Sequence, residues 1–387
     1  MHLAKFNTLA GILALAFSLP AFADEVVNLT VTRAASLPKL TYTDITLRVD
    51  AAGATKAVVT ADEKPVESRI EKDRVIFTTT GSNISVTLTG VTDKALLGKF
   101  SVAALKDDKL WAWSAGFDDN AMFKSTAIPL LEKYHYRGTV FLIGEKVAEK
   151  RNEGWIIDQP DIMRLVKAGW GIGNHTWKHT LVPAEKGAAA KYGTPDWTPT
   201  PADMATAKES VRQTYKMLRA ACDQAGRPDY RLIAFAAPMF DGRWQPVIDD
   251  MIKQSDSEIL FNESGNRSFM CVDPGFKGKP YTSPAAYTLT GSIGRDPAIS
   301  AFGSGAKTDP KEKLTTELAK CSDTYHLWYI TLSHGVSEKD GIMTFIPWVA
   351  ETYGKAGANT VWVAPSDEVF SYLLVRDHTT VARKTAQ

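Results

Sequence analysis

Short segments of alternating apolar and polar residues dominate the first part of the chain. Residues 45–49 and 84–88 alternate strictly, and residues 75–77 and 100–102 fit the same pattern. This alternation is typical of strands with one buried face, and several such strands separated by turn residues predict a small antiparallel sandwich. We assign this β-sandwich, of immunoglobulin-like type, to residues 24–106.

From residue 107 onward, apolar runs alternate with segments of helical periodicity. The expected strands are residues 111–117, 139–143, 171–173, 232–236, 327–332 and 360–363. The expected helices are residues 122–134, 161–167, 202–225 and 366–375, and Pro129 is expected to kink the first of them. Such a series predicts an α/β fold, a distorted (β/α) barrel of about seven strands. We assign this barrel to residues 107–387.

The first 23 residues have the features of a secretory signal peptide. Lys5 supplies a positive start, residues 9–17 form a short apolar run, and Ala21 and Ala23 mark a small-residue cleavage site. A buried N-terminal helix is the alternative. The sequence therefore predicts export to the periplasm or the medium, and no other run is long and apolar enough to form a transmembrane segment.

Composition narrows the range of partners. The formal net charge is +1, removal of Lys5 with the leader takes it to about zero, and no basic cluster stands out, so nucleic acid is not an expected partner. Cys222, Cys271 and Cys321 contain no Cys-x-x-Cys pair, and export would permit one disulfide of unassigned pairing. All ten tryptophans lie at or after Trp111, so the sandwich is expected to be a spacer or packing partner.

Two adjacent carboxylates follow the first expected barrel strand. Asp118 and Asp119 stand directly after residues 111–117, and adjacent residues leaving a strand point in different directions. One carboxylate can therefore ligate a metal while the other accepts a proton. Taken alone, the pair is more simply explained as a cap on the next helix.

Two histidines stand four residues apart after residues 171–173. On a helical turn His175 and His179 would face the same way and hold one cation. Neutral imidazole suits zinc and neighbouring divalent metals. Two unrelated surface histidines are the alternative, but the chain has only seven histidines, so the pair favours a metal site.

A third histidine, His334, follows the apolar residues 327–332. On its own it is equally well explained as a hydrogen-bonded histidine at a strand end.

Taken together, the three clusters predict one site, because the ends of barrel strands converge over one opening. Asp119, His175 and His179 would be three protein ligands of a metal with an open position. Asp118 would then take a proton from water, and His334 would protonate the leaving group.

The order of these segments resembles the polysaccharide deacetylase family, also called carbohydrate esterase family 4 or the NodB-homology family. Phe117-Asp118-Asp119 is similar to its Phe-Asp-Asp motif, residues 172–179 to its His-Ser/Thr-x-x-His motif, and residues 332–334 to its last motif. The resemblance covers about residues 108–375. It implies Asp118 as base, the three ligands named above, His334 as acid, a divalent metal that is often zinc, and an acetylated polysaccharide as substrate.

The chain departs from the family pattern after residues 232–236. Family members have an Arg shortly before a Pro, where it orients the base, but residues 235–239 contain none. Arg231 and Arg243 are the candidate substitutes. The backbone N–H near Met239 is the candidate donor to an oxyanion.

Three further positions complete the predicted site. Asp296 is the candidate for the family's acidic residue that tunes the acid histidine, and Asn120 replaces the common Gly after the carboxylate pair, which we treat as a minor change. Trp177, between the two histidines, is the best candidate for stacking on a sugar ring. Other aromatic residues that could line such a groove are Tyr192, Trp197 and Trp348.

The sequence therefore favours an exported, metal-dependent deacetylase acting on N- or O-linked acetyl groups of a polysaccharide. Two alternatives stay open. A catalytically weak, metal-containing carbohydrate-binding protein of the same fold is favoured by the missing Arg. A hydrolase of a non-sugar amide or imide would be favoured by a small enclosed pocket.

Overall fold

The computed structural model describes most of the chain outside the expected leader. The described residues are 24–120, 122–149, 156–179, 200–240, 243–263, 269–273, 292–293, 310–334, 336 and 341–384. The signal peptide expected at residues 1–23 lies outside them. Among the helices within these ranges, none has the length and apolar character of a membrane span.

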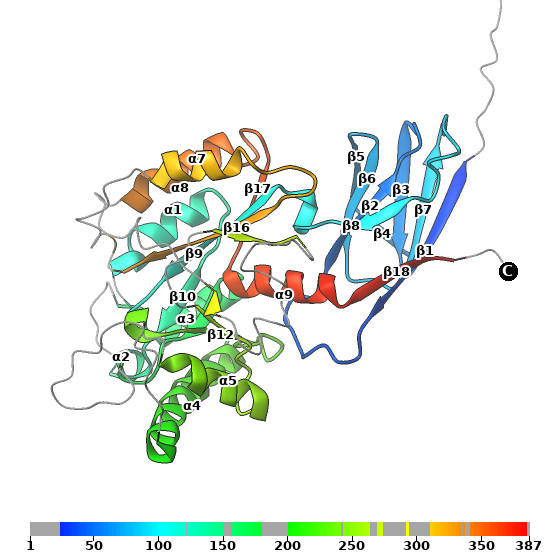
Figure 1. Cartoon of the computed structure of the whole chain (residues 1–387). Helices are drawn as coiled ribbons and strands as arrows, with labels where there is room; N and C mark the ends of the chain where they lie inside the picture. Colours follow the sequence, from blue (N-terminus) through cyan, green and yellow to red (C-terminus); the bar gives the residue numbers. More distant parts are fainter. Residues whose placement is uncertain are drawn as a thin grey trace, which may run out of the picture.

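The N-terminal region is a sandwich of two antiparallel sheets (Figure 1). Its strands are β1 (Glu25–Arg33), β2 (Ile45–Asp50), β3 (Lys56–Ala61), β4 (Lys64–Val66), β5 (Ser68–Glu71), β6 (Arg74–Thr79), β7 (Asn83–Thr89) and β8 (Phe100–Val102). One sheet has the order β18-β1-β7-β3-β4 and the other β5-β6-β2-β8. Alternate residues such as Leu29, Leu47 and Val86 are fully buried between the sheets, as the period of two requires.

The last strand of the chain belongs to the first sheet. β18 (Thr379–Arg383) pairs antiparallel with β1, although the sequence assigned residues 107–387 to the barrel. The preceding helix, α9 (Ser366–Asp377), runs from the barrel to the sandwich in Figure 1. Its Tyr372 hydroxyl donates to the carbonyl of Ala103 at 2.9 Å, and Lys106 bridges Glu368 and Asp44 at 2.9 Å each. The two regions are therefore tied together by buried polar contacts.

The second region is built on one mainly parallel sheet. Its strands are β9 (Trp111–Phe117), β10 (Thr139–Leu142), β11 (Gly171–Asn174), β12 (Ala234–Ala236), β13 (Phe261–Glu263), β14 (Phe269–Cys271), β15 (Ser292–Ile293), β16 (Leu327–Ser333) and β17 (Val361–Val363). The parallel order is β16-β9-β10-β11-β12-β13-β15, with β14 antiparallel to β16. One edge of β9 is shared, because residues 111–113 pair with β17 and residues 116–117 with β10. This arrangement confirms the predicted α/β class and distorted barrel.

Helices cover the parallel sheet (Figure 1). The helical segments are η1 (Lys106–Asp108), η2 (Met122–Lys124), α1 (Ala127–Lys133), α2 (Gly144–Ala148), α3 (Gln159–Lys167), α4 (Pro201–Gln224), η3 (Pro238–Phe240), α5 (Trp244–Gln254), α7 (Pro310–Leu318), α8 (Gly341–Thr352) and α9. The helix expected at residues 122–134 is divided into η2 and α1, and Pro129 lies in the first turn of α1, where its missing N–H breaks no helical bond.

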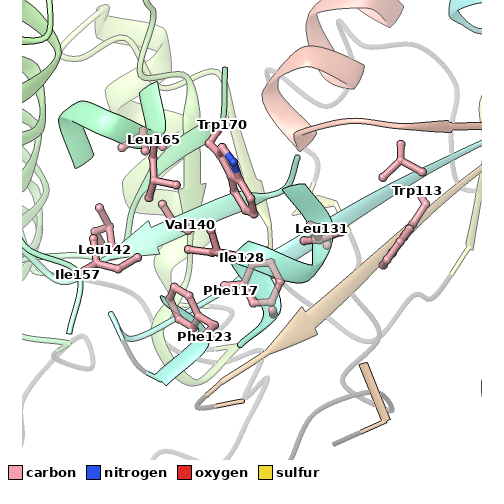
Figure 2. Close-up of a cluster of buried hydrophobic side chains, with 14 of the residues drawn as sticks. Trp113, Phe117, Phe123, Ile128, Leu131, Val140, Leu142, Ile157, Leu165 and Trp170 are labelled. Atoms are coloured by element: carbon pink, nitrogen blue, oxygen red, sulfur yellow. The ribbon is translucent and has the colours of Figure 1, made fainter. Parts of the chain in front are cut away.

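Large side chains fill the space between β9, β10 and the covering helices (Figure 2). Phe117 lies against Phe123 with ring centroids 5.1 Å apart, and Val140 and Leu142 of β10 are fully buried in the same cluster. Ile128 and Leu131 of α1 and Leu165 of α3 close it from the helix side. Close packing of this kind fixes the strands, so side chains at their carboxyl ends start from rigid positions.

A buried acid lies at the amino ends of strands β10 and β11. Asp367, in the first turn of α9, accepts a hydrogen bond from the Tyr230 hydroxyl at 2.7 Å, and that hydroxyl accepts from the Ile172 N–H at 2.8 Å. Burial raises the pKa of Asp367 to about 6, against an ordinary value of 3.8. The native state therefore holds the proton more tightly than the unfolded chain does. This stabilisation is complete below about pH 4 and is lost as the pH rises through about 6.

Replacement of the acid by its neutral isostere should remove this pH dependence. Asp367→Asn keeps an acceptor for Tyr230 but has no charge to bury. We expect its melting temperature, relative to wild type, to rise by about 2–6 °C between pH 4 and pH 7. Differential scanning fluorimetry at both pH values measures the difference, with the exposed Asp223→Asn as control. A difference that does not change with pH would mean that Asp367 is not buried as a charged group.

Candidate metal centre

Predicted site residues follow four of the five consecutive strands β16-β9-β10-β11-β12 at the same edge of the barrel sheet. Asp118 follows β9, His175 follows β11, Met239 lies just after β12 and His334 follows β16. These strands are parallel, so their carboxyl ends face one way. The sheet therefore gathers the predicted residues at a single mouth, as expected for a barrel.

The two carboxylates are separated by the turn that ends β9. The Asp118 N–H donates to the Ser333 carbonyl at 3.0 Å and so continues the pairing of β9 with β16. Asp119 then takes a left-handed conformation, with φ of 73°. The turn sends the Asp119 carboxylate toward the histidines, while the Asp118 carboxylate stays buried.

His175 is oriented by a backbone carbonyl. Its Nδ1 lies 2.8 Å from the oxygen of Ala236, the last residue of β12. A carbonyl can only accept, so Nδ1 carries a proton, which in the neutral ring leaves the lone pair on Nε2. The ring is buried, and Nε2 lies 3.3 Å from Asp119 Oδ1. This is the arrangement in which a histidine serves as a metal ligand.

His179 lies at the same point, but a loop places it there and not the expected helical turn. The sequence predicted a helical turn, but residues 175–179 are not helical, and Thr176 and His179 both have positive φ. The Asn174 side chain holds this loop, because its Oδ1 accepts from the Thr176 N–H at 2.9 Å. The loop brings the two imidazole centroids to 4.9 Å and places His179 Nε2 3.3 Å from Asp119 Oδ1.

The charges in the centre suit a cation. Burial by itself raises the pKa of Asp119, but the contact with His175 and the charges that His175, His179 and His334 carry when protonated outweigh it and hold the pKa well below its usual range. Burial, together with His175, lowers the pKa of His179 to about 4, although Asp119 and Asp118 act in the opposite direction. At neutral pH the carboxylate is therefore ionised and the His179 imidazole neutral, which are the ligand forms.

The donor set passes a direct structural test for a divalent metal. Ligand atoms of Asp119, His175 and His179 all lie within 4.8 Å of one another. Asp119 Oδ1 and His175 Nε2 are buried and have no hydrogen-bond partner of good geometry, which is costly unless another group satisfies them. One carboxylate and two imidazoles are ligands that zinc and similar metals accept.

Asp118 and His334 flank this set. Asp118 is 2% exposed, and its Oδ2 lies 3.8 Å from His175 Nε2, farther than the 3.3 Å of Asp119 Oδ1. His334 is partly exposed at the end of β16 and is close enough to lower the pKa of Asp119. The two groups come from adjacent strands, since β9 and β16 pair along their whole length.

The remaining predicted residues differ in where they lie relative to the mouth of the barrel. Met239 is half exposed at the mouth, with φ of 57°, and Trp177 is partly buried on a groove of about 510 Å³ beside α4. Trp348 is partly buried and packs against Phe345 and Tyr353 at the edge of the core, with ring centroids 5.4 and 5.3 Å apart. Asp296, Tyr192 and Trp197 lie outside the described residues.

The structure also tests the candidate substitutes for the missing Arg. Arg231 precedes β12, at the opposite end of the strands, and binds Glu258 at 2.7 Å, so it does not reach the mouth. Arg243 follows β12 at the edge where the candidate ligands lie, and it is partly buried.

The sequence left one disulfide open, but Cys222, Cys271 and Cys321 are all free thiols in the structure.

Sequence reasoning missed two groups that position His175. The Ala236 carbonyl is a backbone atom, so no residue type could mark it. Asn174 does carry a signal, because Asn before a loop often bonds to the backbone two residues on. Its Nδ2 also donates to the Val211 carbonyl of α4 at 2.9 Å, which anchors the loop to that helix.

A family model described as polysaccharide deacetylase matches residues 108–244, and no curated protein matches the sequence. Among solved structures, a putative polysaccharide deacetylase from Mycobacterium smegmatis is 14% identical with a TM-score of 0.46, over 73% of this chain and 96% of that one. A peptidoglycan deacetylase from Bacillus subtilis is 12% identical with a TM-score of 0.36, over 67% and 89%.

A third structure, a CE4 family pseudoenzyme from Bacillus anthracis, is 13% identical with a TM-score of 0.36, over 67% of this chain and 66% of that one. The segment matched by the family model contains Asp118, Asp119, His175 and His179. Residues 108–244 of this chain therefore match the polysaccharide deacetylase family.

Proposed function

We propose that this chain is an exported, metal-dependent deacetylase that hydrolyses N- or O-linked acetyl groups of a polysaccharide. The observation that carries the proposal is the position of Asp119 Oδ1, 3.3 Å from Nε2 of both His175 and His179. Zinc is the metal that we expect in this set, and other divalent metals accept the same ligands.

The chain's own residues divide the work of hydrolysis between them. A bound divalent metal supplies Lewis acidity toward a carbonyl oxygen. Asp118, buried beside the ligands, accepts a proton from the attacking water as general base. His334 donates a proton to the departing amine or alcohol, and the backbone N–H near Met239 stabilises the developing oxyanion.

The family match of residues 108–244 supports the proposed substrate class, and the expected leader supports the proposed location. Polysaccharides outside the cell are reached only by an exported enzyme, and residues 1–23 have the pattern of a leader. The candidate site lies at the mouth of the barrel, where loops and not the core surround it.

One observation favours a second candidate, a metal-containing carbohydrate-binding protein with weak catalysis. Residues 235–239 lack the family's Arg, and Arg231 is engaged with Glu258 at the far end of β12. A base without its orienting cation would be less well placed for proton transfer. Binding of polysaccharide without acetate release would favour this candidate.

An acetate-release screen tests the proposal. The chain without residues 1–23 is incubated with chitin oligomers, peptidoglycan, acetylated xylan and poly-N-acetylglucosamine. We expect acetate from at least one of them, loss of release after chelation, and recovery when Zn²⁺ is added back. Release that persists after complete metal removal would contradict metal dependence. Release only from small amides or imides would replace the polysaccharide with a non-sugar substrate.

A further inference from the structure

A short segment between β10 and α2 contacts both of the turns that carry the candidate ligands. On the histidine side, the His175 N–H donates to the Leu142 carbonyl at 3.1 Å. The Gly144 N–H donates to the Thr176 carbonyl at 3.1 Å, and the Glu145 N–H to the Trp177 carbonyl at 2.9 Å. The loop of residues 175–177 is therefore bonded along its backbone to residues 142–145.

The same segment holds the carboxylate side. The Asn120 side chain is fully buried, and its Oδ1 accepts from the Ile143 N–H at 2.7 Å. Lys146 Nζ donates to the backbone carbonyl of Asp119 at 3.1 Å. Residues 143–146 thus bond to the Asp119-Asn120 turn through two side chains, and to the histidine loop through two backbone N–H groups.

Both turns have backbone conformations that need support. Asp119 and Asn120 have φ of 73° and 58°, and Thr176 has φ of 66°. The left-handed region costs a non-glycine residue roughly 1–2 kcal/mol, so such turns persist where neighbouring bonds hold them. A free turn at Asp119 would let its carboxylate leave the point that both imidazoles share.

We propose that residues 143–146, together with Asn120, form a brace that fixes Asp119 relative to His175 and His179 for metal binding. Asn120 and Lys146 are positioning residues in this brace, and neither belongs to the candidate ligand set. The inference rests on the proposed metal-dependent function.

The structure also explains why residue 120 is an asparagine. Glycine would adopt the same left-handed conformation, but it has no side chain to reach the Ile143 N–H. Asparagine tolerates that conformation and supplies the acceptor. The replacement that the sequence treats as minor is, in the structure, one of the bonds between the two motifs.

Metal affinity of two variants tests the brace. Asn120→Gly keeps the backbone conformation and removes the bond to Ile143, while Lys146→Met removes the bond to Asp119 and keeps most of the side chain. We expect each metal-free variant to bind Zn²⁺ about 10–100-fold more weakly in competition with a chromophoric chelator, as for other groups that orient ligands. The visible spectrum of bound Co²⁺ should change in parallel, which reports ligand geometry and not overall stability.

Matched variants separate positioning from charge and from folding. Lys146→Arg retains a donor and should restore affinity to within about threefold of wild type. Lys216→Met removes an exposed lysine of α4 that belongs neither to the brace nor to the two turns, so it should leave affinity unchanged. Melting of each metal-free protein identifies a variant that is unfolded, and if Asn120→Gly does not fold, Lys146→Met decides.

Folded Lys146→Met with wild-type affinity and an unchanged Co²⁺ spectrum would overturn the brace and leave the proposed function intact. Wild-type protein that binds neither Zn²⁺ nor Co²⁺ would overturn both. These two results are distinguished by the wild-type titration alone.

Discussion

Asp119→Ala should abolish metal binding and reduce acetate release by about 10³-fold or more, since Lewis-acid catalysis supplies several kcal/mol and 1.36 kcal/mol is a factor of ten. Asp119 Oδ1 is the atom common to both imidazole contacts, at 3.3 Å each. Without it, two imidazoles remain as ligands, and the carboxylate oxygen that both of them contact is lost. Zn²⁺ titration of the metal-free protein and acetate release measure the two effects.

The fold of this variant should survive, because Asp119 lies at the mouth of the barrel and not in its packed core. Far-UV circular dichroism and the melting temperature of the metal-free protein check this expectation. Asp223→Ala is the matched control: its exposed carboxylate pairs with Arg219 on α4, so both metal affinity and acetate release should be retained. Wild-type activity in Asp119→Ala would remove this residue from the ligand set.

The sequence could bring the candidate site residues to one edge of the sheet because the relevant signals are local. β9 and β16 are continuous buried runs, and polar residues that follow such runs must lie at a strand end. Parallel strands bring their carboxyl ends to one edge, so Asp118, His175 and His334 could be expected together before any packing was known. Six strands of the barrel sheet were found for the same reason, but β13, β14 and β15, which have only two or three residues each, were not.

What the sequence could not predict depends on distant partners. β18 is short and has no apolar run, and its place beside β1 follows from where α9 ends, about 350 residues after β1. The left-handed Thr176 and the backbone bonds from residues 143–146 involve atoms that every residue type shares. The helical turn expected for His175 and His179 was wrong for that reason: the spacing fits a helix, but the Asn174 side chain and the Gly144 N–H stabilise a different loop.

Asp118→Asn should separate metal binding from turnover. The substitution preserves size and removes the ability to accept a proton, so we expect Zn²⁺ affinity within about threefold of wild type and acetate release reduced by about 10²–10⁴-fold. The distances give the reason for this split. Asp118 Oδ2 lies 3.8 Å from His175 Nε2, beyond the contact that Asp119 makes, yet it is buried at the edge of the same centre.

The two measurements together assign Asp118 without ambiguity. Lost turnover with retained metal is the result of removing a base, because the ligand set of Asp119, His175 and His179 is left whole. Lost metal would make Asp118 a fourth ligand and would leave the base to another group. Normal turnover would mean that proton transfer from water does not pass through Asp118. The Arg that orients the base in the family is missing at residues 235–239, so this result would favour a mechanism with a different base over the one proposed.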